Sequence, residues 1–123
     1  MGPTDFATQL RSLSHAVEEL SGGRVTFPYE VPLGPRAGEI VRLGFVVPGD
    51  YNLSCPGGPR VRPRLLPINP DASQGHPLGG VHPAPDFGDD WEYWSRPFLG
   101  WAQGGRDARA YMAHVAHLFA TLP

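Results

Sequence analysis

The sequence predicts an α+β fold in which one helix near each end of the chain packs against an antiparallel sheet of about three to four strands. Three observations support this class. Apolar residues recur at helical spacing near both ends, they alternate with polar residues in the middle, and a long stretch without periodicity follows. With 123 residues, 41% of them apolar, the chain is long enough for one core of this kind. We therefore expect residues 1–123 to form a single domain.

The two helices are predicted from their apolar stripes and their ends. In residues 5–20, apolar side chains recur every three or four positions, at Phe6, Leu10, Leu13, Val17 and Leu20. The following Ser21, Gly22 and Gly23 are expected to end this helix. Asp107 is a favourable N-cap for the last helix. That helix should run to about Leu122 and bury Tyr111, Val115, Leu118 and Leu122.

Three runs between the helices predict strands. Residues 24–31 are rich in β-forming residues but contain Pro28, which favours an edge or bulged strand. Residues 60–66 also alternate, and Pro63 again favours an edge position. The clearest strand covers residues 39–47, where one face carries Val41, Leu43, Phe45 and Val47. Residues 69–90 show no period and predict a long loop of the kind found at active sites.

Composition limits the partners and the location. The net charge of −2 gives no reason to expect nucleic acid or an anionic membrane surface as a partner. Apolar runs such as residues 43–47 are far shorter than the roughly 20 residues that span a bilayer, and no secretory signal precedes the first helix. Cys55 is the only cysteine, which agrees with a reducing compartment. We expect a cytoplasmic protein.

Short motifs follow one another in the order found in ubiquitin-conjugating enzymes. That family carries a proline-rich turn, an edge strand, a His-Pro-Asn element, a Gly-x-Ile-Cys element with the catalytic cysteine, and Trp-Ser-Pro. The chain carries, in order, Gly34-Pro35, Pro48-Gly49-Asp50-Tyr51, Cys55-Pro56-Gly57-Gly58-Pro59, His76-Pro77, Gly79-Gly80-Val81-His82 and Trp94-Ser95-Arg96-Pro97. Over roughly residues 25–122 it resembles a divergent bacterial member of the ubiquitin-conjugating (UBC-like) superfamily.

This resemblance implies a site without its usual thiol. His82 stands at the position of the thioester-forming cysteine, His76 lies in the His-Pro element, and Leu78 replaces the asparagine associated with stabilising the oxyanion. Imidazole does not hold an acyl group durably, whereas a thiolate does. The resemblance therefore implies a pseudo-enzyme, without a cofactor, that binds a ubiquitin-like protein or its activating enzyme.

Two alternatives stay open from the sequence. Cys55 is the only possible thiol nucleophile and lies in the proline-rich turn, so an active conjugating enzyme could use Cys55 or His82 in an unusual chemistry. A structural or interaction domain unrelated to ubiquitin-like proteins is the third class.

Two groups of side chains are candidates for binding. Arg60, Arg62 and Arg64 share one face of a predicted strand and could meet an acidic partner or phosphate. Charge and Pro63 would equally protect a sheet edge. The aromatic segment 91–101 supplies three tryptophans. Trp94 is expected in the core, whereas Trp91 and Trp101 fit either the core or an interface.

A metal site is not expected. Zinc needs three or four converging ligands, and the sequence has neither a cysteine pair nor a His-Glu-x-x-His element. The side chains that could otherwise act as ligands are those of His76, His82, Asp86, Asp89, Asp90, His114 and His117.

Overall fold

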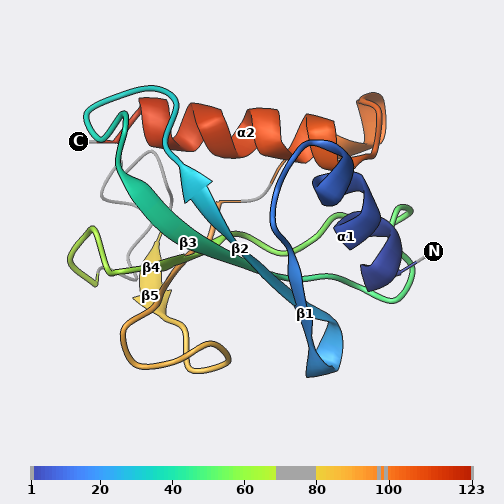
Figure 1. Cartoon of the computed structure of the whole chain (residues 1–123), viewed down its shortest axis with the longest axis horizontal. Helices are drawn as coiled ribbons and strands as arrows, with labels where there is room; N and C mark the ends of the chain where they lie inside the picture. The colour runs from blue at the N-terminus through green and yellow to red at the C-terminus, as the bar shows by residue number, and fades with distance from the viewer. Residues whose placement is uncertain (1, 69–79, 97, 99, 123) are drawn as a thin grey trace.

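The computed structural model describes residues 2–68, 80–96, 98 and 100–122 (Figure 1). Within these ranges the chain is α+β, with one helix near each end as the sequence predicts. The elements are α1 (Pro3–Ser12), β1 (Glu18–Leu20), η1 (Ser21–Gly23), β2 (Arg24–Glu30), β3 (Ile40–Val46), β4 (Arg60–Arg62), β5 (Val81–Pro83), β6 (Glu92–Trp94), η3 (Trp101–Gln103) and α2 (Ala108–Ala120).

The sheet has more strands than the sequence predicts. Six strands in the described residues follow the order β1-β2-β3-β4-β6-β5, and every neighbouring pair is antiparallel. β5 lies inside the segment predicted as a loop, and β6 lies inside the aromatic segment. Both were missed because three residues are too few to establish an alternating pattern.

β2 is the second strand of the sheet, so the prediction of an edge strand was wrong. At the two ends of the β2–β3 pairing, the backbone hydrogen bonds to β3 and its flanking residues are made by Gly23 and Val31. Because backbone groups alternate in direction along a strand, the odd-numbered residues of β2 direct their N–H and C=O groups toward β3. The nitrogen of Pro28 therefore points to the β1 side. β1 pairs with β2 only as far as Thr26, and Pro28 interrupts no ladder.

β4 is also an internal strand, because it lies between β3 and β6. In this register, Arg62 of β4 lies opposite Arg42 of β3, and Val61 of β4 lies opposite Glu92 of β6. The strand ends at Arg62, one residue before Pro63, instead of running to Leu66. Pro63 therefore ends the strand rather than marking a sheet edge.

α1 is shorter than predicted. It ends at Ser12, and Ser14 adopts a left-handed conformation with φ of 74°. The chain then turns into β1, so the residues expected in the last helical turn form an edge strand. Leu13 and Val17 still pack against the core, which explains why the apolar period continues past the helix.

α2 matches its prediction closely. The Asp107 side chain caps it by accepting a hydrogen bond from the Ala110 N–H at 2.9 Å. The predicted stripe is buried: Tyr111, Val115, Leu118 and Leu122. Among the described residues, no helix has the length and apolarity needed to cross a membrane.

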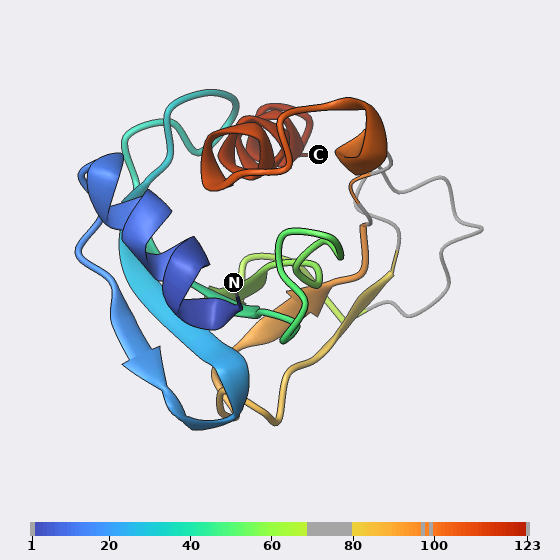
Figure 2. The ribbon, with the colours of Figure 1, turned by 90° about the vertical axis from the view of Figure 1, so that its right-hand side faces the viewer.

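Both helices cover the same face of the sheet (Figures 1 and 2). The ring of Phe45 in β3 lies 5.8 Å from that of Phe6 in α1 and 5.3 Å from that of Tyr111 in α2, between centroids. Further along α2, Phe119 contacts Tyr29 of β2 and Trp94 of β6. The opposite face of the sheet is called the outer face below, and neither α1 nor α2 lies on it.

Candidate functional site

A pocket of about 410 Å³ opens between the loop that precedes β4 and the end of β6. The loop contributes Cys55, Pro56, Gly57 and Gly58, and the opposite wall is formed by Tyr93, Ser95 and Phe98. The pocket therefore brings the only thiol of the chain against the aromatic segment, two regions far apart in sequence.

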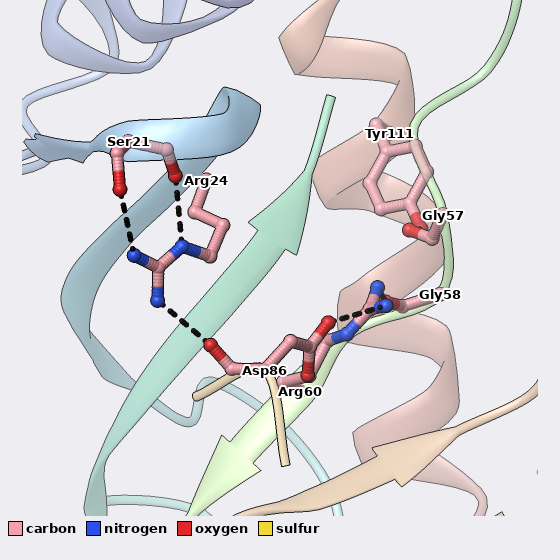
Figure 3. A network of polar contacts seen from close by, with 7 residues as sticks. All are labelled: Ser21, Arg24, Gly57, Gly58, Arg60, Asp86 and Tyr111. Carbon is pink, nitrogen blue, oxygen red and sulfur yellow. Dashed lines mark hydrogen bonds and ion pairs between the residues drawn. The ribbon is translucent and has the colours of Figure 1, made fainter. Parts of the chain in front are cut away.

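Helix α2 and β3 hold the loop in place. The Tyr111 hydroxyl donates to the Gly57 carbonyl at 2.6 Å (Figure 3), and the Gly57 N–H donates to the Val46 carbonyl at 3.2 Å. A Cβ on Gly58 would collide with the Trp94 carbonyl, so only glycine allows this approach. The pocket wall is thus fixed by backbone contacts, with Gly58 at its tightest point.

Arg60 supports the pocket from the outer face. One NH₂ group of its guanidinium donates to the Gly58 carbonyl at 2.9 Å, and the other donates to the Asp86 carboxylate at 3.1 Å. Its central carbon lies 4.4 Å from the centroid of the Tyr93 ring. Arg60 therefore links a pocket-lining loop, a pocket-lining ring and the loop after β5.

Arg24 holds the same loop from β2 (Figure 3). It donates to the Asp86 carbonyl at 2.7 Å and to the Ser21 carbonyl at 2.8 Å. The Phe87 ring lies near both guanidinium groups, and it fills the space that a side chain at Gly44 would need. Two arginines that flank β3 in the sheet thus fasten residues 84–88 to its outer face.

Cys55 is half-buried in the pocket and is a weak nucleophile there. Burial raises the pKa of its thiol from 9.0 to about 11. Because the thiolate is the reactive form, almost all molecules at neutral pH carry the unreactive thiol. Within the part of the chain that the structure describes, the residues that line the pocket include no histidine or carboxylate.

His82 lies on β5, half-exposed, and is not among the residues that line the pocket. It is directly opposite Tyr93 in the register, with ring centroids 6.0 Å apart. Tyr93 is therefore the residue that stands between the two candidate nucleophiles. His76 and Leu78 lie outside the described residues.

His114 lies behind the pocket wall. Its ring stacks on Phe98 with centroids 4.9 Å apart and planes at 7°. Burial lowers the pKa of His114, so the ring is neutral at pH 7.

The three tryptophans are all buried. Trp91, Trp94 and Trp101 are 5%, 0% and 6% exposed, respectively. The indole N–H of Trp94 donates to Glu92 at 3.0 Å, and that of Trp101 donates to the Asn52 carbonyl at 3.2 Å. Their rings are therefore used in packing, and the surface available to a partner is made by other residues.

The three arginines predicted as one row have separate environments. Arg60 is mostly buried by the contacts above. Arg62 lies over the Trp91 ring at 5.6 Å and is 46% exposed. Arg64 follows the end of β4, and its Nε–H donates to the Trp91 carbonyl at 3.1 Å. All three contact residues 86–93, which the sequence did not indicate.

The sequence indicated no role at this site for Tyr93, Ser95 and Glu92, and it offered Asp86 only as a possible metal ligand. The polarity of residues 92–94 gave no usable signal, since it would direct Glu92 outward and Tyr93 inward, whereas Glu92 is buried and Tyr93 only half-buried. Ser95 exchanges hydrogen bonds with the Gly80 backbone and so closes the β5–β6 pairing. In the described part of the chain, no three potential metal ligands among His, Cys, Asp and Glu come together.

Comparison with known proteins gives no relative. The chain matches no protein family, no curated protein and no solved structure.

Proposed function

We propose that the chain is a UBC-like accessory protein of a bacterial ubiquitin-like modification system. In this role it binds the ubiquitin-like modifier or its activating enzyme in the cytoplasm and does not itself carry the thioester. The order of motifs in the sequence supports the assignment, as does the order of elements: α1, an antiparallel meander from β1 to β4, the segment with His82, and α2.

The half-buried position of Cys55, in a pocket whose described lining residues include no histidine or carboxylate, is the observation that carries the proposal. A conjugating enzyme must present a thiolate to an incoming thioester. Here the only thiol is half-buried with a pKa of about 11, and the described residues of its pocket include no base to remove the proton. His82, at the position of the catalytic cysteine in the resemblance, could form only a short-lived acyl-imidazole. The properties of Cys55 and His82 therefore both fit a protein that binds its partner without accepting the modifier as a thioester.

One observation favours the alternative of an active conjugating enzyme. The pocket of about 410 Å³ gives an incoming chain room beside Cys55. Transfer through Cys55 would require the bound partner to supply the missing base, because the described residues do not. We therefore rank this function second, and an interaction domain unrelated to ubiquitin-like proteins third.

The test is to reconstitute the reaction. The purified chain is mixed with ATP and with the cognate ubiquitin-like protein and activating enzyme, and complexes are separated by gel filtration and by gel electrophoresis with and without thiol reductant. We expect a non-covalent complex and no adduct on this chain, with Cys55→Ser behaving like the parent.

Three results would contradict the proposal. A reductant-sensitive adduct that disappears in Cys55→Ser would show an active conjugating enzyme. A reductant-resistant adduct lost in His82→Ala would show histidine chemistry. Failure to bind either protein would leave the third class, an unrelated interaction domain.

A further inference from the structure

Three arginines are not used by the pocket: Arg42 and Arg62 on the outer face, and Arg64 just beyond the end of β4. Arg42 in β3 and Arg62 in β4 lie directly opposite each other in the register. Their strand neighbours Val41, Leu43 and Val61 are buried on the helix side, so both guanidinium groups belong to the outer face. Arg64 follows two residues later, beside the same Trp91 that Arg62 covers.

This arrangement costs stability. Like charges directly opposite each other on one face of a sheet are destabilising. Arg42 is paired with Glu18 at 3.1 Å, but that carboxylate is 61% exposed. Arg62 and Asp90 are 3.9 Å apart, and Asp90 is 67% exposed. Exposed pairs of this kind contribute little. Among the described residues Arg64 has a carbonyl partner and no carboxylate.

An exposed apolar side chain lies next to these charges. Ile40 is two residues before Arg42 on β3, on the same face, and is 69% exposed. Isoleucine gains nothing from this position in the isolated fold. Positions that break local rules without a structural gain are expected at functional sites. The combination calls for a partner that supplies both negative charge and apolar surface.

We propose that Arg42, Arg62, Arg64 and Ile40 form a docking surface for an acidic segment of a partner protein. Carboxylates of the segment would pair with the guanidinium groups, for which planar two-oxygen acceptors are well suited. An apolar side chain between those carboxylates would cover Ile40. A polypeptide is favoured over nucleic acid because the phosphate backbone offers Ile40 no apolar contact, and because the chain has a net charge of −2.

This surface is independent of the proposed function. It needs neither a thioester nor a ubiquitin-like protein, and it lies on the face away from both helices. It also revises the row predicted from sequence, since Arg60 is occupied by Asp86 and Gly58 and is replaced by Arg42.

The probe is a short fluorescein-labelled peptide that alternates glutamate and leucine, measured by fluorescence anisotropy. The same peptide with lysine in place of glutamate and a single-stranded oligonucleotide serve as comparisons. We expect the acidic peptide to bind the parent chain and to bind more weakly as salt rises, since screening is strong beyond about 10 Å at 0.1 M. Arg62→Glu and Ile40→Ser should each weaken binding by about tenfold or more.

Arg11→Glu is the matched control. Arg11 is 45% exposed and also has one carboxylate partner, at 3.2 Å, but it lies on α1. Its substitution should leave peptide binding unchanged. The far-UV circular dichroism of Arg62→Glu should match that of the parent, because the Arg62 side chain is 46% exposed. A matching spectrum would show that lost binding is not lost folding.

Each contrary result overturns the proposal. No binding by the parent, an equal loss in Arg11→Glu, or tighter binding of the oligonucleotide than of the acidic peptide would exclude an acidic-peptide surface. None of these results bears on whether the chain binds a ubiquitin-like protein.

Discussion

Glu92 is the buried carboxylate of the described core, with 0% of the residue exposed. It accepts hydrogen bonds from the Leu65 N–H at 2.9 Å, the Leu66 N–H at 3.2 Å and the Trp94 indole at 3.0 Å. A buried charge is tolerated when donors surround it in this way. Glu92 therefore joins the segment after β4 to β6, and so supports the strand that carries Tyr93.

Removing this carboxylate should be among the most damaging single changes in the chain. Glu92→Ala leaves three buried donors without an acceptor, and we expect a loss of about 3 kcal/mol or more in the free energy of unfolding, measured in urea. Glu92→Gln keeps one acceptor oxygen and should lose about 1–2 kcal/mol. A loss below about 1 kcal/mol for alanine would show that water or a rearranged backbone satisfies these donors.

The raised pKa of Cys55 predicts slow alkylation. A shift from 9.0 to about 11 lowers the thiolate fraction at neutral pH by about a hundredfold. Iodoacetamide should therefore react about a hundred times more slowly with the folded chain than with the chain unfolded in urea at the same pH. The rate should keep rising with pH beyond 9, where an ordinary thiol levels off. Equal rates in both states would show an exposed, ordinary thiol and weaken the case against transfer.

At the scale of elements, the long periodic segments were predictable and the short ones were not. α2 and β3 carry several turns or alternations, and their stripes lie where the sequence places them. β5 and β6 have three residues each, too few to show a period. Pro28 and Pro63 both led to the prediction of an edge strand, which was wrong. Proline lacks only its own backbone N–H donor, so an internal strand can contain or precede a proline where that donor is not needed. In β2, the nitrogen of Pro28 faces the β1 side at a position beyond the end of the β1–β2 pairing. In the other case, β4 ends at Arg62, before Pro63.

The pocket could be predicted only in part. Cys55 and the aromatic segment were both identified as candidates, but their approach depends on the pairing of β4 with β6, a contact that sequence periodicity does not encode. The role of Gly58 depends on its distance from the Trp94 backbone, and the role of Arg60 on a carboxylate 26 residues away. Contacts of this kind arise from tertiary structure.

His15, in the segment between α1 and β1, is expected to make the stability of the fold sensitive to acid. The His15 ring packs on Phe27 with centroids 4.7 Å apart, and burial lowers its pKa from 6.5. A lowered histidine pKa contributes stability that is present above the unfolded value near 6.5 and is lost as the pH falls through the folded value. We therefore expect the melting temperature to fall between pH 7 and pH 5, with His114 contributing in the same direction.

Substitution of His15 isolates its contribution to the pH dependence of the melting temperature. His15→Asn should flatten the dependence of the melting temperature on pH, whatever it does to the value at pH 7. His117→Asn, at an exposed position of α2, is the comparison and should change the slope less, because the charge of His117 is only a minor cause of the lowered pKa of His114. An unchanged slope in His15→Asn would show that the ring leaves its contact with Phe27 when it becomes charged.

At the scale of the whole molecule, all ten basic residues are arginine and the chain contains no lysine. In a system that attaches modifiers to amines, a protein held beside an activated carboxyl terminus would be the nearest acceptor, since proximity raises the effective concentration greatly. Removing every ε-amine would protect it. A GC-rich genome gives the same composition, because it favours Arg, Ala, Gly and Pro, which are abundant here.

Exposed and buried arginines separate these two explanations. Arg11 and Arg109 are exposed, whereas the Arg60 side chain is only 14% exposed and is held by Asp86. We expect Arg11→Lys and Arg109→Lys to acquire the modifier in the complete reaction of activating enzyme, modifier and ATP, because their amines would reach the activated carbonyl. Arg60→Lys should stay largely unmodified, since burial keeps its amine from reaching the carbonyl, and the parent chain should give no lysine conjugate. Mass spectrometry of tryptic peptides identifies the modified positions. If neither exposed lysine is modified while another added substrate is, the absence of lysine gives no protection and base composition accounts for it; if Arg60→Lys is modified as fast as the exposed variants, accessibility in the folded chain does not govern the reaction.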